Sequence, residues 1–413
     1  MIQRIRGTRD FTPAEMHKRR EMETFLRNIS LHFGFSEVLT PVMEHAELFV
    51  AKSGPGVLEE MYSFEDRGGR KLALRPELTA PIIRFYVNEL LDRPLPLKLF
   101  SISNCFRYEE PQLGRYREFY HYDVEIIGSS EPAADAELLL LSDYVCKSLH
   151  LSSYKYRIGH VGIIRDALHA AGVPKEREAE FLHLIDKKRL EDAETLLEGM
   201  TSSTKAEEIM LLCRTRGDIS VLSSLGKTAE HLTRVLELAS GAGFGNFEVD
   251  LGVVRGLDYY TGLVFEIDFP ELGAEKQICG GGSYRLSHLF GGPDTPATGF
   301  AFGFDRLLIA AEKSGWKPAG IRTDAFVIAV EPVREEEAAA LAMNLRRSGL
   351  SVDYDLMGRN LSRALKYCAS AGVRFALIIG ERERKEGVVL LRDMETGMEE
   401  KVPVARLSER IME

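Results

Sequence analysis

The sequence predicts an α+β protein, and three observations carry that prediction. Residues 102–126 read as two strands that alternate polar with apolar positions on either side of a charged loop. Residues 161–242 read as helices rich in Glu, Lys, Arg and Leu, and from residue 325 onward short strands alternate with helices. We therefore expect an antiparallel sheet with flanking helices, a helical insertion, and a small C-terminal α/β domain.

The domain boundaries follow these changes of pattern. A chain of 413 residues is long enough for two or three domains with a large core. We expect the sheet domain at 1–160 and 243–320, the helical insertion at 161–242, and the last domain at 324–413. A linker rich in turn-forming residues, 314–323, precedes that last domain.

The composition is ordinary for a soluble globular protein, with 45% hydrophobic and 28% charged residues. There is no apolar run long enough for a transmembrane helix, and the N-terminal stretch lacks an apolar signal core, so we expect a cytoplasmic protein without a membrane partner. The formal net charge of −10 argues against a general nucleic-acid coat. It leaves open an enzyme that binds RNA through local basic patches.

The cysteines predict neither a disulfide framework nor a zinc site. They are odd in number, scattered, and contain no CxxC pair, which indicates reduced thiols. The five are Cys105, Cys146, Cys213, Cys279 and Cys368.

The first 41 residues predict one helix and one strand. Pro13 opens a helix that runs to about Phe33. Residues 34–41 form a strand that ends at Pro41, since proline cannot donate to a ladder. On its residues alone, this segment is explained by a plain edge strand.

Residues 58–74 predict a hairpin around the turn at 66–69, and a helix follows to about residue 91. Glu77 and Thr79 stand two residues apart at the start of that helix. A carboxylate and a hydroxyl in such a place can simply cap the helix. They can equally face an ammonium group of a ligand.

The hairpin at 102–126 carries the strongest concentration of polar side chains. Period-two geometry puts Arg107 and Glu109 on one face of the first strand, and His121 with Glu125 on one face of the second. If those faces coincide, they form a polar floor that suits a phosphate-bearing ligand with a second polar group. A solvent-facing charged hairpin is the alternative. The loop between the strands contains Pro111, Gln112, Gly114, Arg115 and Arg117.

The middle of the chain returns to helices. An amphipathic helix at 131–149 has Pro132 in its first turn, and a short strand at 154–159 precedes the insertion. Basic residues in the insertion could face an RNA acceptor stem or simply form a solvated helix face. They are Lys187, Lys188, Arg189, Arg214 and Arg216.

Three glycine-punctuated segments follow the insertion. The first, RGLDYYTG at 255–262, follows a strand at 247–253 and places two tyrosines between glycines, with an arginine just before the first glycine. The second, CGGGSY at 279–284, offers backbone that a ligand can approach closely because glycine has no Cβ. The third, 297–307, is a strand that enters a helix carrying Arg306. An aromatic hairpin with core tyrosines is the alternative for the first segment.

The last domain predicts a largely parallel sheet. Strands at 325–330, 352–354 and 375–379 alternate with helices at 334–348 and 361–371. Arg359 and Asn360 stand at a strand-to-helix junction, and a charged segment at 381–384 follows a strand, which makes both positions candidates for RNA contacts.

These segments resemble the motifs of class II aminoacyl-tRNA synthetases. The FRYE segment at 106–109 and GRYREFYHYDVEIIG at 114–128 resemble motif 2 in its histidyl-tRNA synthetase form, and RGLDYYTG resembles a signature peculiar to that family. Residues 13–41 and 297–307 resemble motifs 1 and 3. The C-terminal domain resembles the anticodon-binding domain that histidyl, prolyl, threonyl and glycyl synthetases share. The resemblance covers almost the whole chain, in family order.

The resemblance implies a class II synthetase fold and a two-step reaction. The carboxylate of L-histidine attacks the α-phosphate of ATP, with Mg²⁺, and the histidyl group then passes to the terminal adenosine of tRNA(His). It also implies a homodimer through motif 1, with no metal site built from protein side chains. The implied catalytic residues are Arg107 and Arg255, and the ATP-binding residues are Arg107, Glu109, Arg115 and Arg306. The implied histidine-binding residues are Glu77, Thr79, His121, Glu125, Tyr259, Tyr260 and Tyr284, and the tRNA contacts are Gln112, Arg117, Arg359 and Asn360.

The chain departs from the family pattern at four positions. His121 stands where glutamine is usual, Ser283 where arginine is usual, Arg285 where aspartate is usual, and Asp305 where glutamate is commoner. Three other functions remain alternatives. They are a histidine-biosynthesis regulatory paralogue with the same catalytic fold, an inactive RNA-binding or nutrient-sensing module, and a sister synthetase for proline, threonine or glycine.

Overall fold

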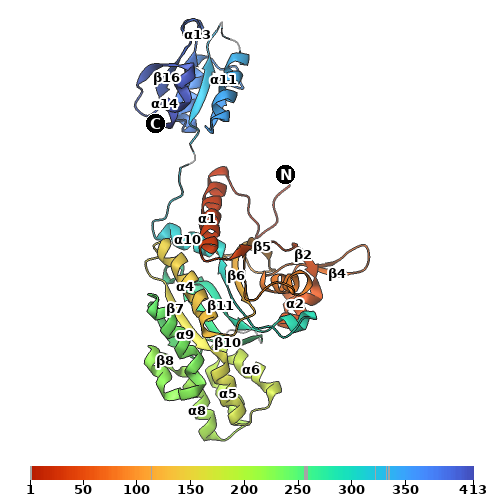
Figure 1. The fold of residues 1–413 in the computed structure, drawn as a ribbon. Coiled ribbons are helices and arrows are strands. Elements are labelled where there is room, and N and C mark those ends of the chain that lie inside the picture. The colour runs from red at the N-terminus through yellow and green to blue at the C-terminus, as the bar shows by residue number, and fades with distance from the viewer. Residues whose placement is uncertain (1, 113, 255–258, 321, 332, 334) are drawn as a thin grey trace. The chain divides into compact units, whose positions relative to one another are not determined.

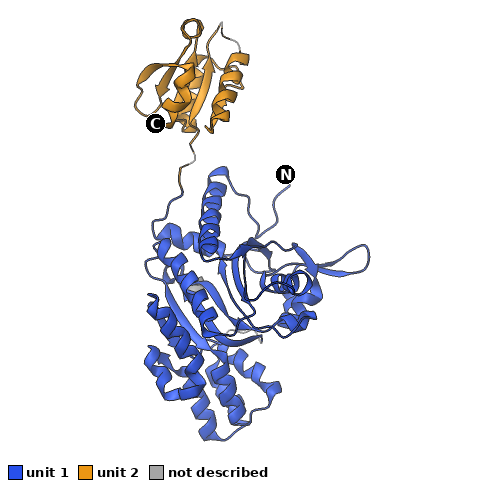
Figure 2. Ribbon diagram, viewed as in Figure 1, with its two compact units in different colours: residues 1–318 blue, residues 319–413 orange. Residues whose placement is uncertain are grey.

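The computed structural model describes residues 2–112, 114–254, 259–320, 322–331, 333 and 335–413. The chain forms two compact units, residues 1–318 and 319–413 (Figure 2). Both units combine helices with sheets that contain antiparallel strands, so the predicted α+β class is confirmed. Within the described residues, no helix is long and apolar enough to cross a membrane.

A mostly antiparallel sheet forms the centre of the first unit (Figure 1). Its nine described strands have the order β1-β5-β6-β12-β11-β10-β7-β9-β8, and the pairs β1–β5 and β7–β9 are parallel. The strands are β1 (Ser36–Glu37), β5 (Leu97–Phe106), β6 (Glu118–Ile127), β7 (Lys155–His160), β8 (Arg216–Gly217), β9 (Phe247–Asp250), β10 (Tyr260–Asp268), β11 (Gln277–Tyr284) and β12 (Ala297–Gly303).

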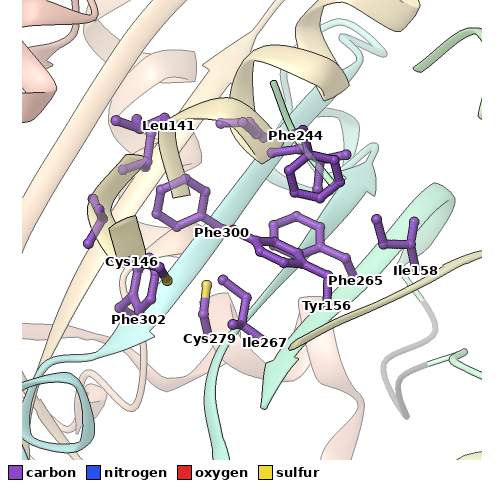
Figure 3. Close-up of a cluster of buried hydrophobic side chains, with 14 of the residues drawn as sticks. Leu141, Cys146, Tyr156, Ile158, Phe244, Phe265, Ile267, Cys279, Phe300 and Phe302 are labelled. Carbon is purple, nitrogen blue, oxygen red and sulfur yellow. The ribbon is translucent and has the colours of Figure 1, made fainter. Parts of the chain in front are cut away.

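Helices bury one face of this sheet. Large apolar residues such as Phe265, Phe300 and Phe302 point from the strands into a core that α4 and α9 cover (Figure 3). Burial of apolar area of this kind is the main favourable term in folding. The helices that contribute to this core are α1 (Pro13–His32), α4 (Pro132–Ser148), α9 (Glu230–Gly241) and α10 (Phe304–Lys313).

A second apolar cluster lies against the other side of the sheet and joins it to the helical insertion. It includes Ile82 of α3, Val264 of β10 and Phe181 of α6. The insertion therefore packs onto the sheet through its own apolar core. Its helices are α5 (Val161–Ala170), α6 (Lys175–Asp186), α7 (Leu190–Glu198) and α8 (Ser203–Arg214), followed by a 3-10 segment (Ile219–Ala229) and α9.

A small three-stranded sheet borders the same side of the first unit. Its order is β2-β4-β3, both pairs are antiparallel, and α2 and α3 pack beside it. The elements are β2 (Met43–His45), α2 (Ala46–Ser53), β3 (Ser63–Glu65), β4 (Lys71–Leu74), α3 (Thr79–Phe85) and the π-helical turn Tyr86–Leu90.

The second unit has its own five-stranded sheet, in the order β14-β13-β15-β16-β17. The first three strands are parallel, as the alternation of strands and helices predicted, and β16 and β17 add an antiparallel hairpin. The elements are β13 (Ala325–Ala329), α11 (Glu335–Arg347), β14 (Val352–Tyr354), α12 (Leu361–Ala371), β15 (Phe375–Ile379), α13 (Glu381–Glu386), β16 (Val388–Asp393), β17 (Glu399–Pro403) and α14 (Leu407–Met412).

Several strand predictions were too long, among them the strand at 247–253, since β9 ends at Asp250. Strand β5 ends at Phe106, so Arg107 and Glu109 lie in the loop beyond it, although the backbone N–H of Arg107 still donates to the carbonyl oxygen of Arg117 at 3.0 Å. Only two residues of the predicted strand 34–41, Ser36 and Glu37, pair with a neighbour. All five cysteines are buried free thiols.

Candidate active site

The face of the central sheet opposite α4 and α9 is hollow, because strand β12 carries almost no side chains there. On β6 the residues His121, Asp123 and Glu125 point to this face. Their partners on β12 are small, with Gly303 opposite His121, Ala301 opposite Asp123 and Gly299 opposite Glu125. A Cβ at residue 299 would lie only 1.7 Å from Oε2 of Glu125. Glycine and alanine on β12 thus leave room beside these β6 side chains, whereas Arg107 and Glu109, predicted to share the same polar floor on a strand, lie in the loop beyond β5.

The first cavity in this hollow has a volume of about 260 Å³. It is lined by all four residues that the resemblance assigns to ATP: Arg107, Glu109, Arg115 and Arg306. These residues come from the loop between β5 and β6 and from the first turn of α10. The fold thus brings together side chains nearly 200 positions apart in the chain.

Carbonyl and carboxylate oxygens hold the guanidinium groups of this cavity in place. Arg107 Nε donates to the carbonyl of Pro76 at 3.0 Å, and Arg115 Nε lies 2.5 Å from Oε2 of Glu109. Arg306 donates to the carbonyls of Gly114 and Gln277, at 3.0 and 2.9 Å. Arg306 therefore ties the β5–β6 loop to β11 across the cavity.

A second cavity, of about 720 Å³, adjoins the first. Arg107 and His121 line both cavities, together with residues of β11 and β12, so the two spaces meet at these side chains. The second cavity is lined by all seven residues that the resemblance assigns to histidine: Glu77, Thr79, His121, Glu125, Tyr259, Tyr260 and Tyr284.

Glu125 is a deeply buried acid of the second cavity, only 1% exposed. Its Oε2 accepts a hydrogen bond from the hydroxyl of Tyr284 at 2.6 Å. Burial raises the pKa of Glu125 to about 8, and the nearby charge of Asp123 acts in the same direction, while hydrogen bonds from Tyr284 and Thr79 oppose it. Near neutral pH this carboxyl group can therefore either donate or accept a hydrogen bond, which suits a ring nitrogen.

Glu77 is held as a charged carboxylate by its neighbours. Its Oε2 lies 2.6 Å from Nζ of Lys52, and its carboxylate also accepts from the backbone N–H groups of Thr79 and Ala80 at 2.9 and 3.1 Å. Burial by itself would raise the pKa of Glu77, but Lys52 and these hydrogen bonds outweigh it, so the pKa is lowered. Glu77 therefore caps α3 and lines the cavity at once. Lys52, which also lies 4.5 Å above the ring of Tyr259, was not predicted.

Part of the RGLDYYTG segment, Arg255 to Asp258, lies outside the described residues, and with it the predicted role of Arg255. The two tyrosines are described, and their ring centroids are 4.5 Å apart. Tyr259 also meets the ring of Tyr284 edge-on at 5.8 Å. The three tyrosines thus form one aromatic wall beside Glu125.

Asp305, the aspartate that precedes Arg306, binds the N-terminal segment to the site. Its Oδ1 lies 2.8 Å from Nη2 of Arg9 and 2.6 Å from Nη1 of Arg19, and its Oδ2 accepts from the backbone N–H of Tyr120 at 3.2 Å. Neither arginine was predicted from the sequence. The signal available for Arg19 was a cation on an otherwise core-facing stripe of α1.

The helical insertion forms one wall of the second cavity. Ala179, His183 and Asp186 of α6, with Lys187 after it, line that cavity. The predicted basic cluster is therefore divided. Lys187 faces the second cavity, whereas Lys188, Arg214 and Arg216 line a separate cavity of about 260 Å³.

Ser283 and Arg285, the two residues of the glycine-rich segment that depart from the family pattern, each contact an aspartate. Ser283 donates to Oδ1 of Asp135 at 2.7 Å, and Arg285 lies 2.9 Å from Oδ2 of Asp294. Ser283 and Tyr284 are consecutive on β11, so they point to opposite faces of the sheet. Tyr284 accordingly keeps its place beside Glu125 although both neighbours differ from the family pattern.

The predicted RNA contacts lie in two places. Gln112 and Arg117 belong to the β5–β6 loop, where Arg117 Nε donates to the carbonyl of Glu109 at 3.1 Å. Arg359 and Asn360 line a cavity of about 740 Å³ in the second unit, near the ends of β13 and β14. Arg359 pairs with Asp355, and the side-chain oxygen of Asn360 caps α12.

Comparison with known proteins assigns the chain to a family. A family model described as histidyl-tRNA synthetase matches residues 7–307, and one described as anticodon binding domain matches residues 324–413. The histidine–tRNA ligase of Archaeoglobus fulgidus is 45% identical over 409 residues, covering 98% of this chain and 97% of the relative. That of Methanocaldococcus jannaschii is 40% identical over 418 residues, covering 99% of each.

Solved structures give the same assignment. Apo histidyl-tRNA synthetase of S. aureus matches with a TM-score of 0.75 and 26% identity over the full length of both chains. A Bacillus halodurans protein titled ATP phosphoribosyltransferase regulatory subunit/histidyl-tRNA synthetase matches with a TM-score of 0.78 and 27% identity, over 92% of this chain and 98% of that one. The chain belongs to the histidyl-tRNA synthetase family.

Proposed function

We propose that this enzyme ligates L-histidine to tRNA(His) in two steps, through a histidyl-adenylate. The observation that carries the proposal is the pair of adjoining cavities. One is lined by the four residues expected to bind ATP, the other by the seven expected to bind histidine, and Arg107 and His121 stand where the two meet. A carboxylate held in one cavity could there reach an α-phosphate held in the other.

Nucleotidyl transfer needs positioning and positive charge where negative charge accumulates. Arg107, at the junction, is suited to the α-phosphate, and Arg306 to the nucleotide beside α10, because guanidinium stays charged and binds phosphate bidentately. Arg115 and Glu109 close the loop side of the ATP cavity. We assign Arg255 to the reacting phosphate from its motif alone.

Histidine recognition is assigned to the second cavity. Glu125 and Tyr260 would bond the two imidazole nitrogens, and a site built to pair such groups rejects analogues that lack them. Glu77 and Thr79 would hold the amino end, and His121 would contact the histidine where the two cavities meet. Tyr284 holds Glu125 through its 2.6 Å hydrogen bond, and Tyr259 completes the aromatic wall.

Mg²⁺ fits this site as a companion of ATP. Within the described residues, no group of three or more His, Cys, Asp or Glu side chains is arranged to hold a metal ion. Mg²⁺ often binds through substrate phosphates and water with only one or two carboxylates, and Glu109 lines the ATP cavity. When bound there, the ion would offset negative charge on the phosphates.

We assign the tRNA to contacts in both units. Gln112 and Arg117 are candidates for the acceptor end, because their loop borders the ATP cavity, and Arg359 and Asn360 for the anticodon. A regulatory paralogue without ligase activity is disfavoured by the matched anticodon-binding segment and by the arginines retained in the ATP cavity. A cytoplasmic location follows from the tRNA substrate and agrees with five free, buried thiols.

We also propose a homodimer formed through the segment that resembles motif 1. Edge strand β1 is followed by three apolar side chains that face solvent in the single chain. Leu39 is 76%, Val42 37% and Met43 56% exposed. An apolar cluster beside an unpaired strand edge is a typical surface for a second copy.

Replacement of Arg107 by alanine should leave a folded enzyme that barely forms the adenylate. The expected loss in the rate of histidine-dependent pyrophosphate exchange is on the order of 10²–10³, since a cation at the transition state is removed. Arg93→Ala, at an exposed arginine outside both cavities, serves as the control. Near-wild-type exchange by Arg107→Ala would refute the role of Arg107.

The substitution Gly299→Ala should abolish histidine binding measured by calorimetry without ATP. Its Cβ would overlap Oε2 of Glu125, so the carboxyl group must leave its place beside Tyr284. Gly303→Ala, on the same face of β12, meets no atom closer than 3.7 Å and should keep the wild-type affinity for histidine. Equal affinities in both variants would show that Glu125 does not recognise the substrate.

A double variant, Leu39→Glu with Met43→Glu, should be monomeric when light scattering is measured during size exclusion, whereas the wild type should have twice the mass of one chain. The added charges would be buried without partners in the proposed interface. Leu211→Glu, at an exposed leucine of α8, is the control and should remain dimeric. A wild-type monomer would contradict the proposed dimer.

A further inference from the structure

Asp123 is a buried acid of the active site that neither the motifs nor the mechanism uses. It lies on β6 between His121 and Glu125, its side chain is 1% exposed, and it lines the second cavity. Among the described residues, neither of its carboxylate oxygens has a hydrogen-bond donor. A buried carboxylate without hydrogen-bond donors costs folding free energy, and native structures contain few such groups.

Arg75 interacts electrostatically with Asp123, but its hydrogen bonds go to other groups. Arg75 is buried close to Asp123, but its guanidinium donates to the carbonyls of Asn104 and Thr40, at 2.9 and 2.6 Å. Arg75 thus supplies long-range attraction without a hydrogen bond to Asp123. It stabilises the charged carboxylate but does not fix its orientation.

The imidazole of His121 lies within reach of Asp123, and the Ser101 hydroxyl, opposite Asp123 on β5, is likewise buried without a hydrogen-bond partner among the described residues. Nδ1 of His121 lies 3.4 Å from Oδ1 of Asp123, and this nitrogen is also buried without a hydrogen-bond partner there. The rings of Phe119 and His121 also meet at an angle, with their centroids 5.0 Å apart, so Phe119 restricts rotation of the imidazole. Two unsatisfied groups that face each other across 3.4 Å need only a small rotation to pair.

His121 occupies the place where such a pairing would affect the reaction. It lines both cavities, so its ring stands at their junction. It also stands where the family usually has glutamine, whose amide donates hydrogen bonds without any titration. An imidazole donates hydrogen bonds through both ring nitrogens only in its protonated form.

We propose that Asp123 is a positioning residue that accepts a hydrogen bond from Nδ1–H of His121 and thereby aims Nε2–H at the junction of the two cavities. There Nε2–H donates to an oxygen of the reacting carboxylate or α-phosphate. No proton is transferred in this step. The histidine carboxylate forms its bond to phosphorus as the bond to pyrophosphate breaks, and the imidazolium offsets the accumulating negative charge. The inference rests on the proposed function.

Several other charged or titratable groups surround His121 and Asp123, but the neighbouring strand β12 contributes no such group. The facing strand β12 contributes only Ala301 and Gly303 at these positions. The surrounding titratable and charged groups are Cys105, Glu125, Glu77, Arg75, Arg107 and Lys52. The substitutions below keep all six residues, but Asp123→Asn also removes the charge that raises the pKa of Glu125. Only an effect on kcat that disappears in the His121→Gln background therefore reports on the His121–Asp123 pair.

The test is a double-mutant cycle in pyrophosphate exchange, with kcat and both KM values measured between pH 6 and 9. Asp123→Asn should lower kcat about tenfold with little change in the KM for histidine, which is the range for removing a residue that orients a functional histidine. His121→Gln should remain active, since the side-chain amide of glutamine also donates a hydrogen bond.

The decisive comparison is Asp123→Asn in the His121→Gln background. We expect a change in kcat of less than about twofold there, because the residue to be positioned is gone. Equal effects of Asp123→Asn in both backgrounds, or a loss confined to KM, would each overturn the inference. Asp268→Asn, which neutralises another buried acid of the same sheet outside both cavities, should leave kcat unchanged.

Failure of this inference is distinguishable from failure of the proposed function. If the wild-type enzyme shows no histidine-dependent exchange, the proposed function falls and the inference falls with it. If the wild type is active but the cycle shows no coupling, only the inference falls. Thermal melting of every variant separates a loss of folding from a loss of positioning.

Discussion

The site depends on one steric constraint, the lack of side chains on β12 opposite the polar residues of β6. The register of these two strands sets Gly299 against Glu125, and even a methyl group at residue 299 would occupy the place of the carboxyl oxygen. The opposite face of β12 shows the contrast, because Phe300 and Phe302 fill the core there (Figure 3). One strand thus packs the core on one face and leaves a cavity on the other, which strict period-two alternation makes possible.

Local patterns in the sequence predicted much of this arrangement. Strand alternation put His121 and Glu125 on one face, and the resemblance supplied two sets of residues that the fold gathers into two adjoining cavities. Contacts between distant segments could not be read in this way. Lys52 reaches Glu77 across 25 positions, and Arg9 reaches Asp305 across 296, and neither contact leaves a periodic signature.

The predicted strand through residue 109 was wrong at its end, where the chain leaves the sheet and enters the site. Residues 107–109 keep an alternating pattern, but the polypeptide leaves the sheet after Phe106, and this lets Arg107 reach the cavity junction. The insertion was predicted as a helical module, yet its sequence did not reveal that His183 and Lys187 form a cavity wall. In both cases the side chains are charged or polar, so hydrophobic periodicity carries no information about them.

The account holds that ATP and histidine occupy adjoining cavities that meet at Arg107 and His121. The most direct test is a crystal structure with a non-hydrolysable histidyl-adenylate analogue. We predict its imidazole against Glu125 and Tyr260, its phosphate mimic beside Arg107 and His121, and its adenosine beside Arg306. An analogue bound in one cavity only, or bound without contact to Arg107 and His121, would contradict the account.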